Sequence, residues 1–184
     1  MKKRILLIIG IALVAIIALL AWFRSYTKSH SPAAKAIIEN REVKIVINYC
    51  QPYKKGRLIF GDETSGALQP YGKYWRIGAN EATTFETNKP LMVNDQHLKV
   101  GKYSMYAYPG KEYWQIVFNS ESERWGVPAP DPSNDIVKTN VPCTNNNPLE
   151  EQLVISLMQG DSNSIQMLIY WDQTKVMLPI ALQK

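Results

Sequence analysis

The chain has 184 residues, with 21 Lys and Arg against 16 Asp and Glu and a formal charge of +5. The first 28 residues hold five basic side chains and no acid, so the remaining 156 residues are neutral overall. A neutral domain lacks the clustered basic surface that binds polyanions through counterion release, which argues against a nucleic-acid partner. A hydrophobic content of 46% excludes an intrinsically disordered chain.

An apolar segment of 19 uncharged residues runs from Ile5 to Phe23. As a helix it would be about 28 Å long at ~1.5 Å per residue, close to the ~30 Å hydrocarbon core of a bilayer. Trp22 falls where an aromatic side chain would lie in the headgroup region. The segment therefore predicts a single transmembrane helix, with the lipid bilayer as the partner of residues 5–23.

The alternative is a cleaved signal peptide, whose apolar stretch is usually only about 7–15 residues long and ends at a small-x-small site. The sequence Ala-Leu-Leu-Ala at 18–21 has the wrong spacing, which favours an uncleaved signal anchor. Three basic residues precede the span and two follow it, so the positive-inside rule places residues 1–4 in the cytoplasm. We then expect a stalk over 24–40 and a domain over 41–184 on the periplasmic face of the inner membrane. Residues 33–38 of the stalk suit either a helical turn or an extended segment.

After Arg41 the apolar pattern changes to period two, which is typical of strands that bury one face. Strands are expected at 43–50, 83–87, 90–93, 102–109, 113–119, 135–141, 152–159, 164–171 and 175–182. Turn residues at 93–97 and 159–163 predict β-hairpins. These elements are typical of an antiparallel sandwich or barrel. We favour an all-β, jelly-roll-like β-sandwich preceded by one N-terminal transmembrane helix.

Residues 56–78 hold five of the ten glycines, a pattern that does not suit an ordinary sheet. Glycine permits positive φ and close backbone approach, so we expect a long structured loop here. Charged, amide and aromatic residues lie within this segment or just after it, namely Arg57, Asp62, Tyr71, Trp75, Arg76, Asn80 and Glu81. Paired guanidinium groups with an amide and aromatic faces suit a carboxylate, a phosphate or a sugar. These seven residues form the candidate ligand site.

Two other interpretations of these residues stay open. In the first, Arg57 and Arg76 pair with Asp62 and Glu81 and only hold the loop on the sheet. In the second, Asp62 and Glu81 are the two carboxylates of a hydrolase that acts on envelope glycans or esters. Because a glycine-rich loop separates these two acids, their spacing sets no distance, and no catalytic residue is assigned.

The same region resembles a known family. Residues 52–61 (PYKKGRLIFG) and 70–83 (PYGKYWRIGANEAT) are similar to the opening and the central signature of the bacterial domain-of-unknown-function family 2911. Residues 101–109, 114–119 and 125–126 follow in the family's order, so the resemblance extends over residues 31–182. Where the family commonly has Ser-Arg-Pro, this chain has Cys-Gln-Pro at 50–52. The resemblance implies a compact, exported, strand-rich domain and brings no established activity.

Histidine and cysteine are scarce, with two of each. His30 lies in the expected stalk, which leaves His97 alone in the domain. We therefore expect no multi-histidine metal site, a Ser-His-Asp triad would depend wholly on His97, and no cofactor is assigned. Cys50 and Cys143 could form one disulfide in an oxidising compartment or remain two free thiols.

The leading hypothesis from these patterns is a membrane-anchored, extracytoplasmic β-domain that binds a small molecule or an envelope component without catalysing its turnover. The first alternative is the hydrolase that uses Glu81 and Asp62. The second is a structural domain for protein interaction, which would show an apolar surface patch and no pocket.

Overall fold

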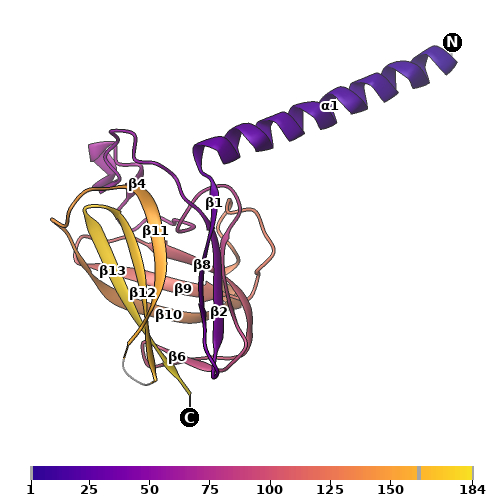
Figure 1. Ribbon diagram of the computed structural model, residues 1–184. Coiled ribbons are helices and arrows are strands. Elements are labelled where there is room, and N and C mark those ends of the chain that lie inside the picture. Colours follow the sequence, from indigo (N-terminus) through magenta and orange to yellow (C-terminus); the bar gives the residue numbers. More distant parts are fainter. Residues whose placement is uncertain (1, 161–162, 184) are drawn as a thin grey trace.

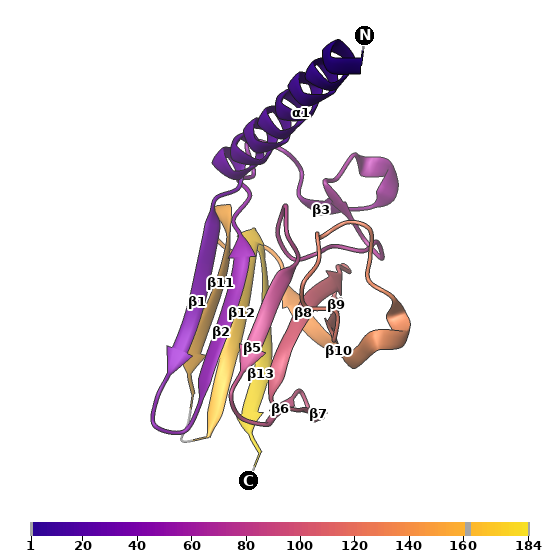
Figure 2. The ribbon, with the colours of Figure 1, turned by 90° about the vertical axis from the view of Figure 1, so that its right-hand side faces the viewer.

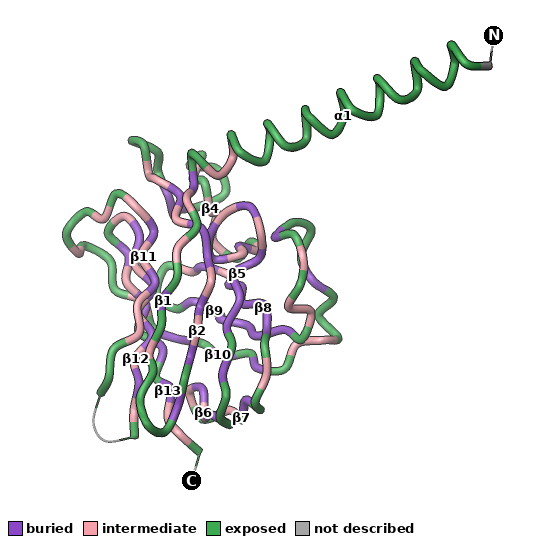
Figure 3. Tube along the Cα trace, turned by 45° about the vertical axis from the view of Figure 1, so that its right-hand side comes forward, coloured by how far each residue is buried: buried purple, intermediate pink, exposed green. Residues whose placement is uncertain are grey.

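The computed structural model describes residues 2–160 and 163–183, and it consists of a long helix followed by a β-domain (Figure 1). The helix, α1 (Lys2–His30), projects from one end of the domain, and its apolar side chains are exposed along its length (Figure 3). α1 is long and apolar enough to cross a membrane, and it is the only such helix among the described residues. An all-β domain preceded by one apolar helix is therefore confirmed.

The region expected as a stalk is helix and strand in the structure. Residues 24–30 continue α1, and after two residues the chain enters β1 (Ala33–Glu39). β1 pairs with β2 (Lys44–Cys50) from Ala33 opposite Cys50 to Glu39 opposite Lys44. Of the two alternatives for residues 33–38, a helical turn or an extended segment, the extended one is therefore correct. Their own sequence carries only a weak strand signal, and β2 supplies hydrogen-bond partners for their backbone groups.

The main strands form one continuous antiparallel sheet that folds back on itself into two layers (Figures 1 and 2). The first layer runs in the order β1, β2, β5 (Thr83–Thr87), β8 (Gly101–Tyr108), β9 (Tyr113–Asn119) and β10 (Asp135–Thr144). The second layer runs in the order β13 (Thr174–Leu182), β12 (Ser164–Asp172) and β11 (Glu150–Gln159). β10 joins the layers, because it pairs with β9 along most of its length and with β13 at residues 143 and 144. The order β10-β13-β12-β11 is that of a Greek key.

Short elements complete the domain. These are β3 (Phe60–Gly61), the 3-10 turn η1 (Glu63–Ser65), β4 (Gln69–Pro70), β6 (Leu91–Val93), β7 (Gln96–Leu98) and the 3-10 turn η2 (Pro132–Asn134). β6 and β7 form the hairpin predicted at 93–97, with positive φ at both Asn94 and Asp95. The tip of the hairpin predicted at 159–163 includes residues 161 and 162, which lie outside the described residues, and β11 and β12 pair antiparallel on either side of it.

The first layer meets β11, the far edge of the second layer, near the end of β2, which nearly closes the sheet. The Tyr49 hydroxyl donates to the Ile155 carbonyl (3.2 Å) and accepts from the Ile155 N–H (3.0 Å). Beyond β2, the N–H of Leu153 donates to the carbonyl of Pro52 (3.1 Å). These bonds pair the end of β2 and the residues after it with β11, so backbone groups that an open sheet would expose find partners.

Aromatic side chains fill the space between the layers. Trp114, Trp171, Phe85 and Phe118 are among the largest fully buried side chains. Phe60 contacts both Trp114 and Trp171, with ring centroids 4.9 Å and 6.2 Å away. In Figure 3, β5, β8 and β9 are mostly purple, the colour of buried residues. Through Phe60, the long loop described next is therefore packed onto the core.

Candidate functional site

A long loop, residues 51–82, connects β2 to β5 at the end of the domain that α1 enters (Figures 1 and 2). Gly56, with φ 69°, turns the chain through the left-handed region that glycine adopts without steric penalty. The loop rejoins the sheet at Trp75, whose N–H donates to the carbonyl of Ala107 (2.8 Å). The glycine-rich segment therefore forms the structured loop that its composition predicts.

A cavity of about 420 Å³ lies beside this loop, and we call it the basic pocket. It is lined by His30, Ser31, Pro52, Lys55, Arg57, Leu68, Gln69, Arg76, Gly78, Ala79 and Trp171. Among these described residues are two arginines, a lysine and a histidine, and no carboxylate. A cleft lined by charges of one sign concentrates the opposite charge, so the basic pocket suits an anion.

Arg57 is held at this pocket by backbone carbonyl groups. Its Nε–H donates to the carbonyl of Lys54 (2.9 Å), and Nη2 donates to the carbonyl of Tyr53 (2.5 Å). These bonds orient the exposed guanidinium group, but a carbonyl carries no net charge to neutralise it. Arg57 thus presents an oriented positive charge.

Arg76 is less exposed than Arg57, and its Nε is buried without a hydrogen-bond partner in the described part of the chain. Gly126 packs against its stem so closely that a Cβ at position 126 would overlap the Arg76 side chain. Burial lowers the pKa of the Arg76 guanidinium, because the charged form loses hydration. The group still stays charged at neutral pH, since an arginine does not deprotonate in proteins.

The backbone that follows Arg76 has an unusual conformation. Ile77 and Asn80 have φ values of 49° and 61°, which are uncommon for non-glycine residues and rare for β-branched ones. The Thr83 hydroxyl donates to the carbonyl of Ile77 (2.7 Å), and the N–H of Gly126 donates to the carbonyl of Asn80 (3.1 Å). Such conformations persist where neighbours over-determine them, so these bonds set the position of Arg76.

Neither arginine is paired with the acids of its own loop. None of the ion pairs formed by the described residues includes Arg57 or Arg76. Asp62 is exposed at the start of η1, and Glu81 pairs with cations of α1. The interpretation in which four loop residues neutralise one another is therefore wrong.

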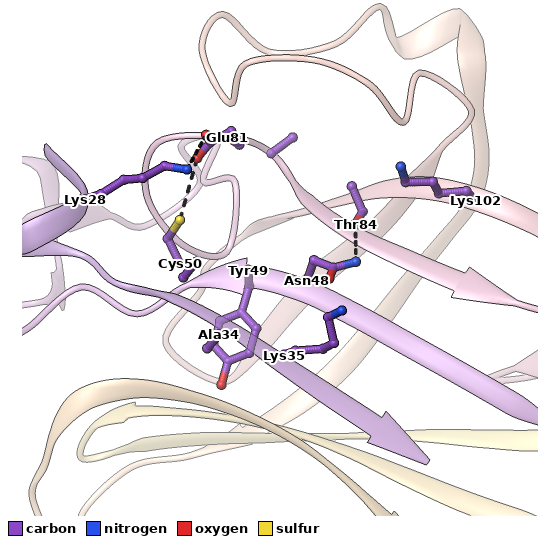
Figure 4. A pocket seen from close by; sticks show the side chains of 11 residues that line it. Lys28, Ala34, Lys35, Asn48, Tyr49, Cys50, Glu81, Thr84 and Lys102 are labelled. Atoms are coloured by element: carbon purple, nitrogen blue, oxygen red, sulfur yellow. Dashed lines mark hydrogen bonds and ion pairs between the residues drawn. The ribbon is translucent and has the colours of Figure 1, made fainter. Parts of the chain in front are cut away.

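A second cavity, of about 470 Å³, lies between the end of α1 and the strands β1, β2 and β5 (Figure 4). We call it the Glu81 pocket, and it is lined by Lys28, Ala33, Ala34, Lys35, Asn48, Tyr49, Cys50, Glu81, Ala82, Thr84 and Lys102. Glu81 Oε1 accepts from Arg24 Nη2 (3.1 Å) and lies 3.3 Å from Lys28 Nζ. Glu81 therefore joins the domain to the last two turns of α1.

Glu81 and Cys50, which contact each other in the Glu81 pocket, both have shifted pKa values. Burial raises the pKa of Glu81, but hydrogen bonds from its own N–H and from Lys28, with the charges of Lys28 and Arg24, outweigh burial and leave the pKa lowered. Burial also raises the pKa of the Cys50 thiol, whose Sγ donates to Glu81 Oε2 (3.8 Å, Figure 4). At neutral pH the carboxylate is thus ionised and the thiol protonated.

The other four candidate residues line neither pocket. Trp75 is 3% exposed and stacks on Trp171 in the core, with ring centroids 5.9 Å apart. Tyr71 packs against the same core, and Asp62 is exposed. Asn80 is buried, and its Nδ2 donates to the carbonyl of Ser31 (3.5 Å). The structure thus brings only Arg57 and Arg76 together in one cavity and places Glu81 in the other.

Sequence reasoning missed Lys55, Gln69 and His30 as pocket residues. Lys55 lies between Lys54 and Arg57 in a short basic run, and this signal could have found it. His30 was assigned to a stalk, and its place in the basic pocket depends on how the end of α1 meets the domain.

The two cysteines are free thiols in the structure. Cys50 contacts Glu81, whereas Cys143 Sγ donates to the carbonyl groups of Gly110 (3.5 Å) and Lys111 (3.4 Å). The disulfide that the sequence left open between Cys50 and Cys143 is therefore not formed here.

The described chain is thus an antiparallel β-domain joined to one helix able to span a membrane, with two pockets near the end of that helix. A family model described as a protein of unknown function (DUF2911) matches residues 31–180. The chain belongs to this family, which confirms the resemblance. The match begins before β1, so β1 is part of the family's domain. No curated protein and no solved structure shows a significant match to the chain.

Proposed function

We propose that the protein is a membrane-anchored binding module that holds a small anionic ligand, a phosphate or a carboxylate, in the basic pocket without catalysing its turnover. The observation that carries the proposal is the shared cavity of Arg57 and Arg76, two guanidinium groups that have no carboxylate partner among the described residues. Each presents N–H donors in the planar arrangement that matches the oxygens of a phosphate or carboxylate.

The energetics of Arg76 support this proposal. Burying part of a charged group without a counter-ion or hydrogen bond is unfavourable, and the Nε of Arg76 has neither. An anion in the pocket would supply the counter-charge that the Arg76 guanidinium lacks. A charge-assisted hydrogen bond contributes about 1.5–3 kcal/mol, so a ligand that reaches Arg76 gains affinity from a group whose hydration is already lost.

The geometry favours binding over hydrolysis. A hydrolase that uses Asp62 and Glu81 needs both carboxylates at one cleft. Among the described residues, Glu81 lines a pocket that does not include Asp62, and Glu81 is engaged by Arg24 and Lys28. A purely structural interaction domain is expected to have no pocket, whereas this domain has pockets of about 470 and 420 Å³ beside the end of α1.

Titration of the full chain in maltoside micelles with inorganic phosphate and with glycerol 3-phosphate tests the proposal. Isothermal titration calorimetry is expected to show one site per chain. Arg76→Gln should weaken binding by about ten-fold or more, because it removes a charge-assisted contact. Arg57→Gln should weaken it to a similar or smaller extent, since Arg57 is the more exposed of the two.

Arg41→Gln is the matched control for both variants. Arg41 is an exposed arginine in the turn between β1 and β2, away from the basic pocket, so its removal should leave the affinity unchanged. Absence of binding at tens of millimolar anion, or equal affinities for wild type and Arg76→Gln, would refute the proposal.

We also propose that α1 is an uncleaved signal anchor and that the β-domain lies outside the cytoplasm, on the periplasmic face of the inner membrane. Three basic residues before the span against two after it support this orientation. A reporter fused after Lys184 is expected to be active outside the cytoplasm, and replacement of Lys2, Lys3 and Arg4 by glutamine should lower that activity. Activity of the wild-type fusion inside the cytoplasm would overturn the orientation, and a protein that lacks residues 1–23 in cells would overturn the anchor.

A further inference from the structure

The basic pocket adjoins the end of α1. α1 ends at His30, two residues join it to β1, and His30 and Ser31 both line the pocket. Figures 1 and 2 both show the loop of residues 51–82 at the end of the domain from which α1 departs. The pocket therefore lies at the end of the domain that faces the membrane when α1 spans it.

The length of α1 places this pocket near the lipid headgroups. His30 follows the last residue of the apolar segment, Phe23, by seven positions, which is about 10 Å along a helix. A headgroup layer is roughly 5–8 Å thick on each side of the hydrocarbon core. Any tilt of α1 brings His30 nearer to the core, so the pocket is within reach of the headgroups.

Contacts hold the end of α1 against this part of the domain. Arg24 and Lys28 pair with Glu81, and Asn80 Nδ2 donates to the carbonyl of Ser31. Asn80 and Glu81 lie near the end of the loop that also carries Arg76, with only Ala82 between Glu81 and β5. The short connection and these contacts keep the pocket close to the membrane surface.

The loop also presents apolar side chains next to its basic ones. Leu58 is 46% exposed and directly follows Arg57, and Leu68 is 38% exposed and lines the basic pocket. The two leucines are on paired backbone segments, because the N–H of Leu68 donates to the carbonyl of Leu58 (2.9 Å). Exposed leucines beside Lys and Arg place on this loop the combination of side chains with which amphipathic helices enter the membrane interface.

We propose that the anion held in the basic pocket is the phosphate of a membrane phospholipid, bound by Arg57 and Arg76 while Leu58 and Leu68 contact the apolar part of the lipid next to its headgroup. This proposal rests on the basic pocket being an anion site, as inferred above, and it names the membrane as the source of the anion. A free phosphate compound offers the same oxygens but nothing for the two leucines to contact.

Native mass spectrometry of the full chain in maltoside micelles tests the proposal with dioleoyl phosphatidylglycerol as the probe. The wild type is expected to retain one tightly bound lipid, at least ten-fold more tightly than it binds glycerol 3-phosphate in the calorimetric titration. Dioleoylglycerol has the same chains and no phosphate, so it should not compete for this site. Arg57→Gln combined with Arg76→Gln should lower the affinity for the lipid at least ten-fold, and Arg41→Gln should leave it unchanged.

Substitution of the leucines separates this inference from the function on which it rests. Leu58→Ser combined with Leu68→Ser is expected to weaken phosphatidylglycerol binding about five-fold or more, with no change in the affinity for glycerol 3-phosphate. Both side chains are partly exposed, and their replacement should leave the fold intact, which an unchanged thermal unfolding temperature checks. Equal affinities for the lipid and glycerol 3-phosphate, or displacement of the lipid by dioleoylglycerol, would refute the membrane as the source while leaving an anion site. Loss of binding to every probe would refute both proposals.

Discussion

Replacement of Trp75 by alanine is expected to lower the free energy of unfolding by about 3–5 kcal/mol, the range for removing a large aromatic from a core. Trp75 is 3% exposed and packs against Phe60, Trp114 and Trp171, with ring centroids 5.4–5.9 Å away. Alanine would leave a cavity among three aromatic rings that rigid neighbouring strands cannot close. Denaturation of the full chain in maltoside micelles, followed by circular dichroism, measures this change.

Trp125→Ala is the matched control, because Trp125 is 46% exposed. Its replacement should change the free energy of unfolding by no more than about 0.5 kcal/mol, as for most surface positions. If Trp75→Ala left stability intact and abolished only the binding of phosphate, Trp75 would belong to the ligand site after all. The expected result would establish it as a residue of the core.

Replacement of Lys54 by methionine is the second change with a large expected effect. Lys54 Nζ lies 2.5 Å from Asp172 Oδ2, and the two side chains are only 17% and 14% exposed. Removing one partner leaves the other charge unpaired, which costs about 3–5 kcal/mol in a fully buried pair. Because some solvent reaches this pair, we expect Lys54→Met to lower the free energy of unfolding by about 2–3 kcal/mol.

A double-mutant cycle checks that the pairing causes this loss. Asp172 has φ 55°, which asparagine tolerates, so Asp172→Asn removes the charge without backbone strain. Adding Asp172→Asn to Lys54→Met should recover part of the lost stability, because no unpaired charge then remains. Lys73→Met is the control, since its pair with Glu63 is more than half exposed on both sides and should contribute at most about 1 kcal/mol. Strictly additive losses in the cycle would contradict the assignment.

The pair of Lys54 and Asp172 also bears on the basic pocket. It fastens the start of the long loop to the last residue of β12, and the Arg57 guanidinium is oriented by the carbonyl groups of Tyr53 and Lys54. Loosening this segment should let Arg57 move relative to Arg76. The Lys54→Met variant can therefore also show weaker anion binding, and its stability should be measured before any loss of affinity is interpreted.

Local periodicity accounts for most of the secondary structure that the sequence predicted. The strands expected at 83–87 and 113–119 coincide with β5 and β9, and the ends of the later strands differ by at most three residues. The turn at Asn94 and Asp95 could also be predicted from the sequence, because Asn and Asp readily adopt the positive φ that both positions have. Each of these signals depends on neighbours in the chain, which is why the sequence alone carries it.

β1 is a strand that local sequence signals do not predict. Its sequence, Ala-Ala-Lys-Ala-Ile-Ile-Glu, has small residues at most of the positions that would mark a buried face, and only Ala36 is buried. The segment becomes a strand because β2 offers it a full set of hydrogen-bond partners. Pairing of this kind depends on tertiary context and not on propensity.

The candidate site shows the same division. The composition and the family motif singled out Arg57, Trp75, Arg76 and Glu81. Whether each of them lies in the core, in an ion pair or in a cavity was decided by contacts with residues distant in the sequence. Trp75 packs into the core against Trp114 and Trp171. Glu81 pairs with Arg24 and Lys28 of α1, which precede it by more than fifty residues in the sequence. Only Arg57 and Arg76 came to share a cavity.

The sequence by itself determined an apolar helix, a strand-rich domain of a recognisable family and a net charge that comes from the flanks of that helix. Only the tertiary structure decided that two arginines lack acidic partners among the described residues and that their cavity lies beside the end of α1. The physical reason is that periodicity and composition report which side chains avoid water, whereas the partner of a buried charge depends on how distant segments meet. In this chain those segments are the end of α1, the loop of residues 51–82 and Gly126.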